Sequence, residues 1–367
     1  MSQDFHFDPS ILHSVVGGRS AIDMPALNFK SLKEVDAFLK GYGFDGSQPE
    51  SLERIWYFHR RALVLMQEKL GFALEEIPEV LRERKLLEDP RKLLLFASSM
   101  QDQNLQKWSC ALLRCIHVFV HAENDLFSSF SEEIQKQILS PFQNCIYHDG
   151  TSGKTFLKAT EDSANPNSEP ISLLGFESKP FKTSTSTVIK LLAKPQALAM
   201  SVFDKLGVRF ITHSMMDTFR VVRFLVDENL ISFPHIMPDQ SSNNLFPVDL
   251  FIRACSELEN KEKALSDSEV QGFFARYLER NKDEAEFFRK ENAFSGQDYK
   301  FIKFISRKLI RIAVDGQKSE FSFFYPFEVQ IVDQEAHSKI LSGPSDHQAY
   351  KERQRQAARK RLFPEPS

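Results

Sequence analysis

The stretch FEVQIVDQEAHSKILSGPSDHQAYK, residues 327–351, contains the clearest strand pattern of the chain. Phe327, Val329 and Ile331 alternate with Glu328 and Gln330. In an extended backbone, this alternation puts the apolar side chains on one face and a carboxylate and an amide on the other. Two histidines and a Tyr-Lys pair follow closely. The stretch therefore predicts a buried strand that presents an acid beside further polar groups.

The surrounding segments place this strand in a mixed domain. Residues 206–214 and 299–314 have the apolar pattern of strands, and residues 184–194 and 215–229 have that of helices. Strands interleaved with helices predict a mixed α/β or α+β domain over 176–351. A charged helical stretch at about 250–293 differs in composition from the strands around it, so we interpret it as an insertion.

The first part of the chain has a helical pattern instead. Apolar residues recur at helical spacing in 51–71 and 104–127, which predicts a mostly helical domain over 1–150. We expect a helix from residue 131 to end at Pro141. Residues 151–175 are rich in Gly, Ser, Asn, Asp and Pro and predict a linker. Residues 352–367 form a basic tail, which suits a solvated helix or a contact with RNA or an acidic partner.

Composition indicates an intracellular globular protein without a membrane span. Hydrophobic residues make up 42% of the chain and charged residues 26%, and the formal net charge of -3 gives no overall nucleic-acid footprint. The four cysteines match neither a zinc ribbon nor a disulfide framework. The first residues lack a secretory pattern, and no run reaches the roughly 18 apolar residues of a membrane helix. We therefore expect a cytoplasmic location.

A possible phosphate-binding helix precedes the strands. Lys182, Ser186 and Lys190 recur at four-residue steps, so a helix places them on one face. Two ammonium groups beside a hydroxyl can bind phosphate if that face lines a cleft. A solvated helix face with a capping serine explains the same spacing.

Two carboxylates on strands form the second candidate feature. Asp204 lies at the entry of the strand that contains Arg209, and Glu328 lies within its own strand. Carboxylates on neighbouring strands can share Mg²⁺, which commonly acts with nucleotide phosphates. An exposed charge at a sheet edge is the alternative for either residue.

In this order, the segments resemble the RelA/SpoT-type (p)ppGpp synthetase domain, a branch of the nucleotidyltransferase-like fold. Its Lys-x3-Ser-x3-Lys helix is matched by Lys182, Ser186 and Lys190. Its Asp-x-x-Gly-Ile/Val-Arg strand is matched by residues 204–209. Its Glu-Ile/Val-Gln-Ile strand, two histidines and Tyr-Lys are matched by Glu328, Val329, Gln330, Ile331, His337, His347, Tyr350 and Lys351.

The resemblance implies a Mg²⁺-dependent pyrophosphokinase with ATP as donor and a nucleotide, GDP or GTP above all, as acceptor. It implies catalytic and metal-binding roles for Asp204 and Glu328. The ATP-binding residues that it implies are Lys182, Ser186, Lys190 and Arg209. The acceptor-binding residues that it implies are Gln297, Tyr299, Gln330, His337, His347 and Lys351.

The chain departs from the family at three places. Pro180 occupies the position of an arginine before the first lysine, where Lys179 can substitute, and Val332 replaces a second arginine. The acceptor-binding Gly-Tyr loop is not recognisable, and FSGQDYKFIKF, with Gln297 and Tyr299, is its nearest counterpart. These departures leave open an enzyme that transfers pyrophosphate to an RNA end, and a non-catalytic nucleotide sensor whose helical domain binds a protein partner.

His117, His121 and Asp125 also recur at four-residue steps, a spacing that can bind a divalent metal. The hydrolase domain of many RelA/SpoT proteins requires a His-Asp dipeptide and further ligands in order, and His148-Asp149 lies in a predicted loop. We therefore interpret the two histidines as part of a helix interface.

Overall fold

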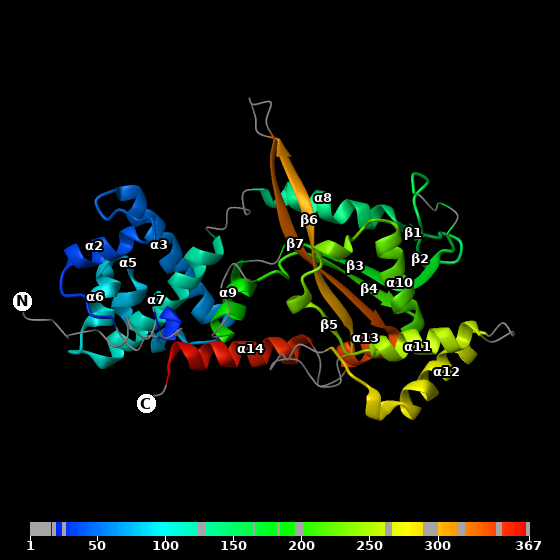
Figure 1. Cartoon of the computed structure of the whole chain (residues 1–367). Helices are drawn as coiled ribbons and strands as arrows, with labels where there is room; N and C mark the ends of the chain where they lie inside the picture. Colours follow the sequence, from blue (N-terminus) through cyan, green and yellow to red (C-terminus); the bar gives the residue numbers. More distant parts are fainter. Residues whose placement is uncertain are drawn as a thin grey trace, which may run out of the picture. The chain divides into compact units, whose positions relative to one another are not determined.

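The computed structural model describes residues 16, 20–23, 27–123, 130–163, 166, 168–181, 184–194, 202–260, 266–288, 300–313, 320–342 and 347–364. It confirms a mixed α and β architecture (Figure 1). The chain divides into two compact units. Unit 1 comprises residues 1–128, 183–202 and 351–367, and unit 2 comprises 129–182 and 203–350. In the part of the chain that is described, no helix combines the length and apolar character that a membrane crossing needs.

Unit 1 is helical. It contains α2 (Leu32–Lys40), α3 (Pro49–Val64), α4 (Glu79–Arg82), α5 (Arg84–Leu87), α6 (Lys92–Ser98), α7 (Gln103–Glu123), α9 (Ser184–Ala193) and most of α14 (His347–Leu362). The apolar stripes of α3 and α7 supply much of its core, and α9 adds Val188, Leu191 and Leu192.

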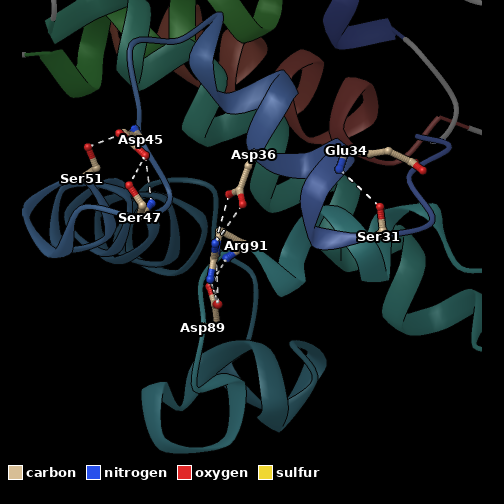
Figure 2. A network of polar contacts seen from close by, with 8 residues as sticks. All are labelled: Ser31, Glu34, Asp36, Asp45, Ser47, Ser51, Asp89 and Arg91. Atoms are coloured by element: carbon tan, nitrogen blue, oxygen red, sulfur yellow. Dashed lines mark hydrogen bonds and ion pairs between the residues drawn. The ribbon is translucent and has the colours of Figure 1, made fainter.

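Arg91 joins two segments of this unit (Figure 2). Its guanidinium donates to Asp36 on α2 at 3.0 Å and to Asp89 at 2.7 Å. A Cβ at Gly46 would lie 2.0 Å from Asp36 Oδ1 and 2.8 Å from Arg91 Nη1, so the absence of a side chain makes room for the ion pair.

The basic tail differs from the solvated helix that its composition predicts. Arg361 pairs with Asp23 at 2.6 Å and donates to the carbonyls of Leu191 and Leu192. Arg359 donates to Gly71 O at 2.8 Å and its guanidinium lies 4.1 Å from the Phe72 ring centroid. These arginines therefore satisfy backbone carbonyls of unit 1.

Unit 2 contains a seven-stranded sheet in its described residues, with the order β1-β2-β3-β4-β7-β6-β5. The strands are β1 (Ile146–His148), β2 (Thr155–Leu157), β3 (Ile171–Lys179), β4 (Gly207–Thr212), β5 (Ser242–Asn243), β6 (Ile302–Ala313) and β7 (Glu320–Asp333). β4 and β7 are parallel, and the other neighbours are antiparallel. The helices are α8 (Ser131–Asn144), α10 (Met215–Asp227), α11 (Val248–Glu259), α12 (Asp267–Arg280) and α13 (Gln334–Ser342).

Helices pack on both faces of this sheet. On one face, the Phe142 ring of α8 lies 6.3 Å from Phe210 and 5.8 Å from Phe327 between centroids. On the other face, Ala336 of α13 packs with Ile211 and Val332. The second face is the one that Glu328 shares with Val332, because side chains two residues apart in a strand point the same way.

Two expectations for this region are wrong. α8 continues through Pro141 to Asn144 rather than ending there. The predicted linker contains β2 and the start of β3, because Asp149 and Gly153 close a turn between short strands. Asp149 N donates to Lys154 O at 2.9 Å, and Gly153 adopts a φ of 67°. α11 and α12 confirm that much of the stretch at about 250–293 is helical, while its interpretation as an insertion stays a prediction.

His117 on α7 should make unit 1 sensitive to acid. Its Nδ1 lies 2.8 Å from Tyr42 Oη. Burial, with smaller effects from His121 and Arg361, lowers the pKa of His117 from 6.5 to about 4. Between these values the unfolded chain binds a proton that the folded chain does not. The free energy of unfolding should therefore fall as pH drops through this window, by at most about 3 kcal/mol.

Tryptophan fluorescence can follow this effect, because the only two tryptophans of the chain, Trp56 and Trp108, belong to unit 1. Urea denaturation at pH 7 and pH 4.5 should show a smaller pH difference in His117→Gln than in the native chain. Burial also lowers the pKa of His59, which should leave a residual effect of the same sign. Equal pH dependence in both proteins would contradict the assignment to His117.

Candidate functional site

Four neighbouring strands of unit 2 bring a set of polar side chains onto one face of the sheet. In one cross-strand row, Gly207 of β4 pairs with Glu328 of β7 and with Lys179 of β3. The next row joins the paired residues Glu177, Arg209, Gln330 and Lys303. Residues paired across strands present their side chains on the same face. The cluster therefore arises from sheet register rather than from one sequence motif.

Hydrogen bonds link the members of this cluster. Lys179 Nζ donates to Glu328 Oε1 at 3.0 Å and to Gln330 Oε1 at 2.9 Å. Arg209 Nε donates to the same Gln330 oxygen at 2.9 Å, while its Nη1 donates to Glu177 at 2.9 Å. Lys303 Nζ lies 3.8 Å from Glu328 Oε2. An ammonium group therefore lies near each oxygen of the Glu328 carboxylate.

Burial makes this arrangement electrostatically important. Glu328 is 8% exposed and Gln330 is 4% exposed. A buried carboxylate requires compensating charge, and Lys179 and Lys303 provide it. Among the described residues that these contacts link, the cluster has three cationic groups and two carboxylates. The positive surplus and the hydrogen-bond donors suit an anionic ligand such as phosphate.

A glycine sets the distance between the two parallel strands at this point. A Cβ at Gly207 would lie 2.4 Å from Glu328 O and 3.0 Å from Glu328 Cβ. Glu328 N donates to Leu206 O at 2.9 Å just beside it. Any larger residue at Gly207 would have to move β4 away from the strand that holds the carboxylate.

The structure brings together only some of the residues predicted for the site. Arg209, Glu328 and Gln330 share the cluster. Asp204 is half-buried and precedes β4 by three residues, which span at most about 11 Å. His337 is half-buried on α13, one residue after Ala336.

The remaining predicted residues belong to unit 1 or lie outside the described part. Ser186 is exposed and Lys190 half-buried on α9, which belongs to unit 1, as does the exposed Lys351. Lys182, Gln297, Tyr299 and the side chain of His347 lie outside the described residues. Their roles stay predictions.

Sequence reasoning missed the cluster's other members. The sequence patterns point to neither Glu177 nor Lys303, and they point to Lys179 only as a substitute for an arginine. The residue pairs Glu177/Lys179 and Glu328/Gln330 each alternate on one strand face, which is the local signal. Their convergence on one face depends on strand order and register, which a single motif does not contain.

The side-chain oxygens of the candidate site are of the chemical type that Mg²⁺ binds. Glu328, Gln330 and Asp204 offer carboxylate and amide oxygens, which are the hard ligands that Mg²⁺ binds. Because Lys179 occupies Glu328 Oε1 and Gln330 Oε1, a cation at these oxygens would require this lysine to move. Within the described residues, no group of three or more His, Cys, Asp and Glu side chains is arranged to bind a metal.

The histidines of α7 have a structural partner. His117 contacts Tyr42, and the His117 and His121 ring centroids are 4.5 Å apart. Asp125 lies outside the described residues. Tyr42 lies in the turn that follows α2, so this contact is between α7 and that turn.

Comparison with known proteins adds no assignment to this geometry, because no family model matches the chain and no curated protein matches its sequence.

Proposed function

We propose that this chain is a Mg²⁺-dependent pyrophosphokinase, which transfers the β,γ-pyrophosphate of ATP to the 3′-hydroxyl of a nucleotide. The observation that supports it best is the buried Glu328 carboxylate between Lys179 and Lys303, on a face with surplus positive charge. A buried acid beside phosphate-binding cations suits proton transfer next to a phosphate group. GDP or GTP is the acceptor that the resemblance implies.

In this proposal, the ion pairs of the cluster exchange partners when ATP binds. Lys179 and Arg209 leave Glu328, Gln330 and Glu177 and donate to phosphate oxygens instead. Glu328 can then accept the proton of the attacking hydroxyl. The new bond forms between the 3′-oxygen and the β-phosphorus, and the bond from that phosphorus to the leaving AMP breaks. Mg²⁺, held by Asp204 and Glu328, would supply positive charge to the phosphate oxygens.

Lys179→Met should weaken ATP binding. Losing one charge-assisted contact costs about 1–3 kcal/mol, so the Kd should rise about 5- to 150-fold. Calorimetric titration with a non-hydrolysable ATP analogue measures this change. Lys282→Met is the control, because Lys282 is 64% exposed in the same unit and pairs only weakly with Glu279 at 3.0 Å. Unchanged affinity in Lys179→Met would mean that its ion pairs only reinforce the sheet.

The same titration on Lys190→Ala tests the proposed role of α9. The buried side of this helix contains Thr187, Val188 and Leu191, whereas Ser186 is exposed and Lys190 half-buried. A loss like that of Lys179→Met would support phosphate binding by α9. Native affinity would contradict a phosphate-binding role for the face of α9 that contains Ser186 and Lys190.

One assay separates the candidate functions. The purified chain is incubated with Mg²⁺, γ-labelled ATP and a panel of acceptors, and the products are separated by thin-layer chromatography. Label on a guanine nucleotide supports the proposal, and label on an RNA end supports the alternative transferase. ATP binding without any transfer supports a nucleotide sensor and contradicts the pyrophosphokinase.

A further inference from the structure

The outer half of the β6–β7 hairpin extends past the neighbouring strand β4 (Figure 1). β4 pairs with residues 328–333 of β7, whereas β6 and β7 pair with each other over 302–313 and 320–331. One face of the outer half packs against the rest of the protein, since its residues Ile310, Ile312 and Tyr325 are buried. The opposite face is exposed.

Four side chains form a strip on this exposed face: Arg307, Leu309, Arg311 and Phe324. All four are exposed, and Phe324 and Leu309 retain 46% and 39% of their accessible surface. Leu309 pairs with Phe324 across the two strands. The strip therefore combines an open aromatic ring with two guanidinium groups.

The geometry around Phe324 suits stacking with a planar ring. Arg307 Cζ lies 5.8 Å from the Phe324 ring centroid. The His235 ring meets Phe324 edge-on at 4.8 Å between centroids. Aromatic rings beside arginines are the usual platform for unpaired nucleobases, and arginine also binds the phosphates between them.

Charge selects the same class of partner. On the face of β6 that carries the strip, the charged residues are Lys303, Arg307 and Arg311, all of them basic, although the whole chain has a net charge of -3. A protein partner would require a larger apolar area than Leu309 and Phe324 provide, since stable interfaces bury about 800 Å² per side. A polyanion that exposes aromatic rings complements both the guanidinium groups and the phenylalanine ring of the strip.

The strip also leads toward the candidate site. Residues 303, 305, 307, 309 and 311 share one face of β6, and Lys303 belongs to the cluster around Glu328. Phe324 and Glu328 are four residues apart on β7, which corresponds to about 13 Å. A strand of nucleotides stacked on Phe324 could therefore reach the cluster with its end.

We propose that the strip of Arg307, Leu309, Arg311 and Phe324 binds single-stranded nucleic acid. The binding does not depend on the proposed pyrophosphate transfer. Combined with pyrophosphate transfer, it would favour the alternative acceptor, a nucleic-acid end, over GDP or GTP.

Fluorescence anisotropy with labelled 12-nucleotide RNA and DNA, single-stranded and duplex, tests the proposal without ATP. The native chain should prefer single strands over duplex, and comparison of RNA with DNA identifies the sugar that is favoured. Phe324→Ala should raise the Kd about 5- to 150-fold, the effect of losing one stacked base. Arg307→Ala and Arg311→Ala should each lower the slope of log affinity against log salt by about 0.7.

Phe321→Ala is the matched control. Phe321 is 42% exposed on the same strand, but its odd number places it on the opposite face from Phe324. The Phe321→Ala variant should bind single-stranded oligonucleotides with the affinity of the native chain. Equal losses in both phenylalanine variants, native binding by Phe324→Ala, or failure of every oligonucleotide to bind would overturn the proposal. A chain that binds the oligonucleotides but transfers no pyrophosphate would contradict the proposed function and still support nucleic-acid binding by the strip.

Discussion

Glu328→Gln should lower the rate of the proposed transfer by about 10²–10⁴, the usual effect of removing a general base. Glutamine keeps the size of the side chain and can still accept a hydrogen bond from Lys179. It cannot accept the hydroxyl proton, and it is a weaker ligand for Mg²⁺. The change therefore removes chemistry while it keeps most of the packing around a residue that is 8% exposed.

The same variant should lose little stability. Lys179 also bonds Gln330, and the Lys179 and Lys303 side chains are 26% and 34% exposed, so both are partly in contact with water. We expect the free energy of unfolding to fall by about 1 kcal/mol, because removing a buried charge also removes its desolvation cost, which offsets most of the lost attraction. Glu177→Gln is the comparison: this acid is 45% exposed on the same face, and its loss should lower the rate less than tenfold.

Measuring the transfer rate and the melting temperature on one preparation separates two roles of Glu328. A catalytic carboxylate predicts a large loss of rate with a small loss of stability. A purely structural ion pair predicts the reverse, with a lower melting temperature and retained turnover. The second result would remove the main support for the proposed function.

Local sequence patterns predicted the elements in which apolar residues alternate or recur without interruption. α7, α10, β4 and β6 belong to this group. β3 was missed because a register shift between Leu173 and Gly175 breaks its two-residue alternation. The start of β7 was missed because Pro326 usually marks the end of a strand.

The position of Pro326 explains why the strand tolerates it. Glu328 N points to β4, since it donates to Leu206 O. Two residues earlier, the nitrogen of Pro326 points to the same side, beyond the residues that β4 pairs with. The missing N–H therefore costs no ladder hydrogen bond.

Sequence patterns predicted only the part of the candidate site that lies on a single strand, β7. The alternation around Glu328 and Gln330 identified the face. Lys179 and Lys303 could not be assigned, because each reaches Glu328 only through the pairing of β3 with β4 and of β6 with β7. The bond from Lys179 to Glu328 joins residues that are more than 100 positions apart, and no local sequence pattern contains such a contact.

Gly207→Ala should destabilise unit 2 by about 3 kcal/mol, since overpacking a well-packed position costs about 1–3 kcal/mol and occasionally more. The new Cβ would lie 2.4 Å from a backbone oxygen of Glu328, and a backbone atom cannot turn aside as a long side chain can. For a unit of this size, that energy corresponds to a fall of about 6–12 °C in Tm. Because the tryptophans belong to unit 1, scanning calorimetry is the suitable measurement.

Gly150→Ala separates this overlap from the general effect of replacing a glycine. A Cβ at Gly150 meets nothing within 4 Å, so alanine there should be neutral or stabilising by up to about 1 kcal/mol, through the entropy of the unfolded chain. The difference in Tm between the two variants then measures the contact at Gly207 alone. If Gly207→Ala melts within about 2 °C of Gly150→Ala, β4 can move away from β7 at little cost. The position of Glu328 would then not be fixed by this strand pair, and the rigid site on which the proposed transfer depends would lose its structural basis.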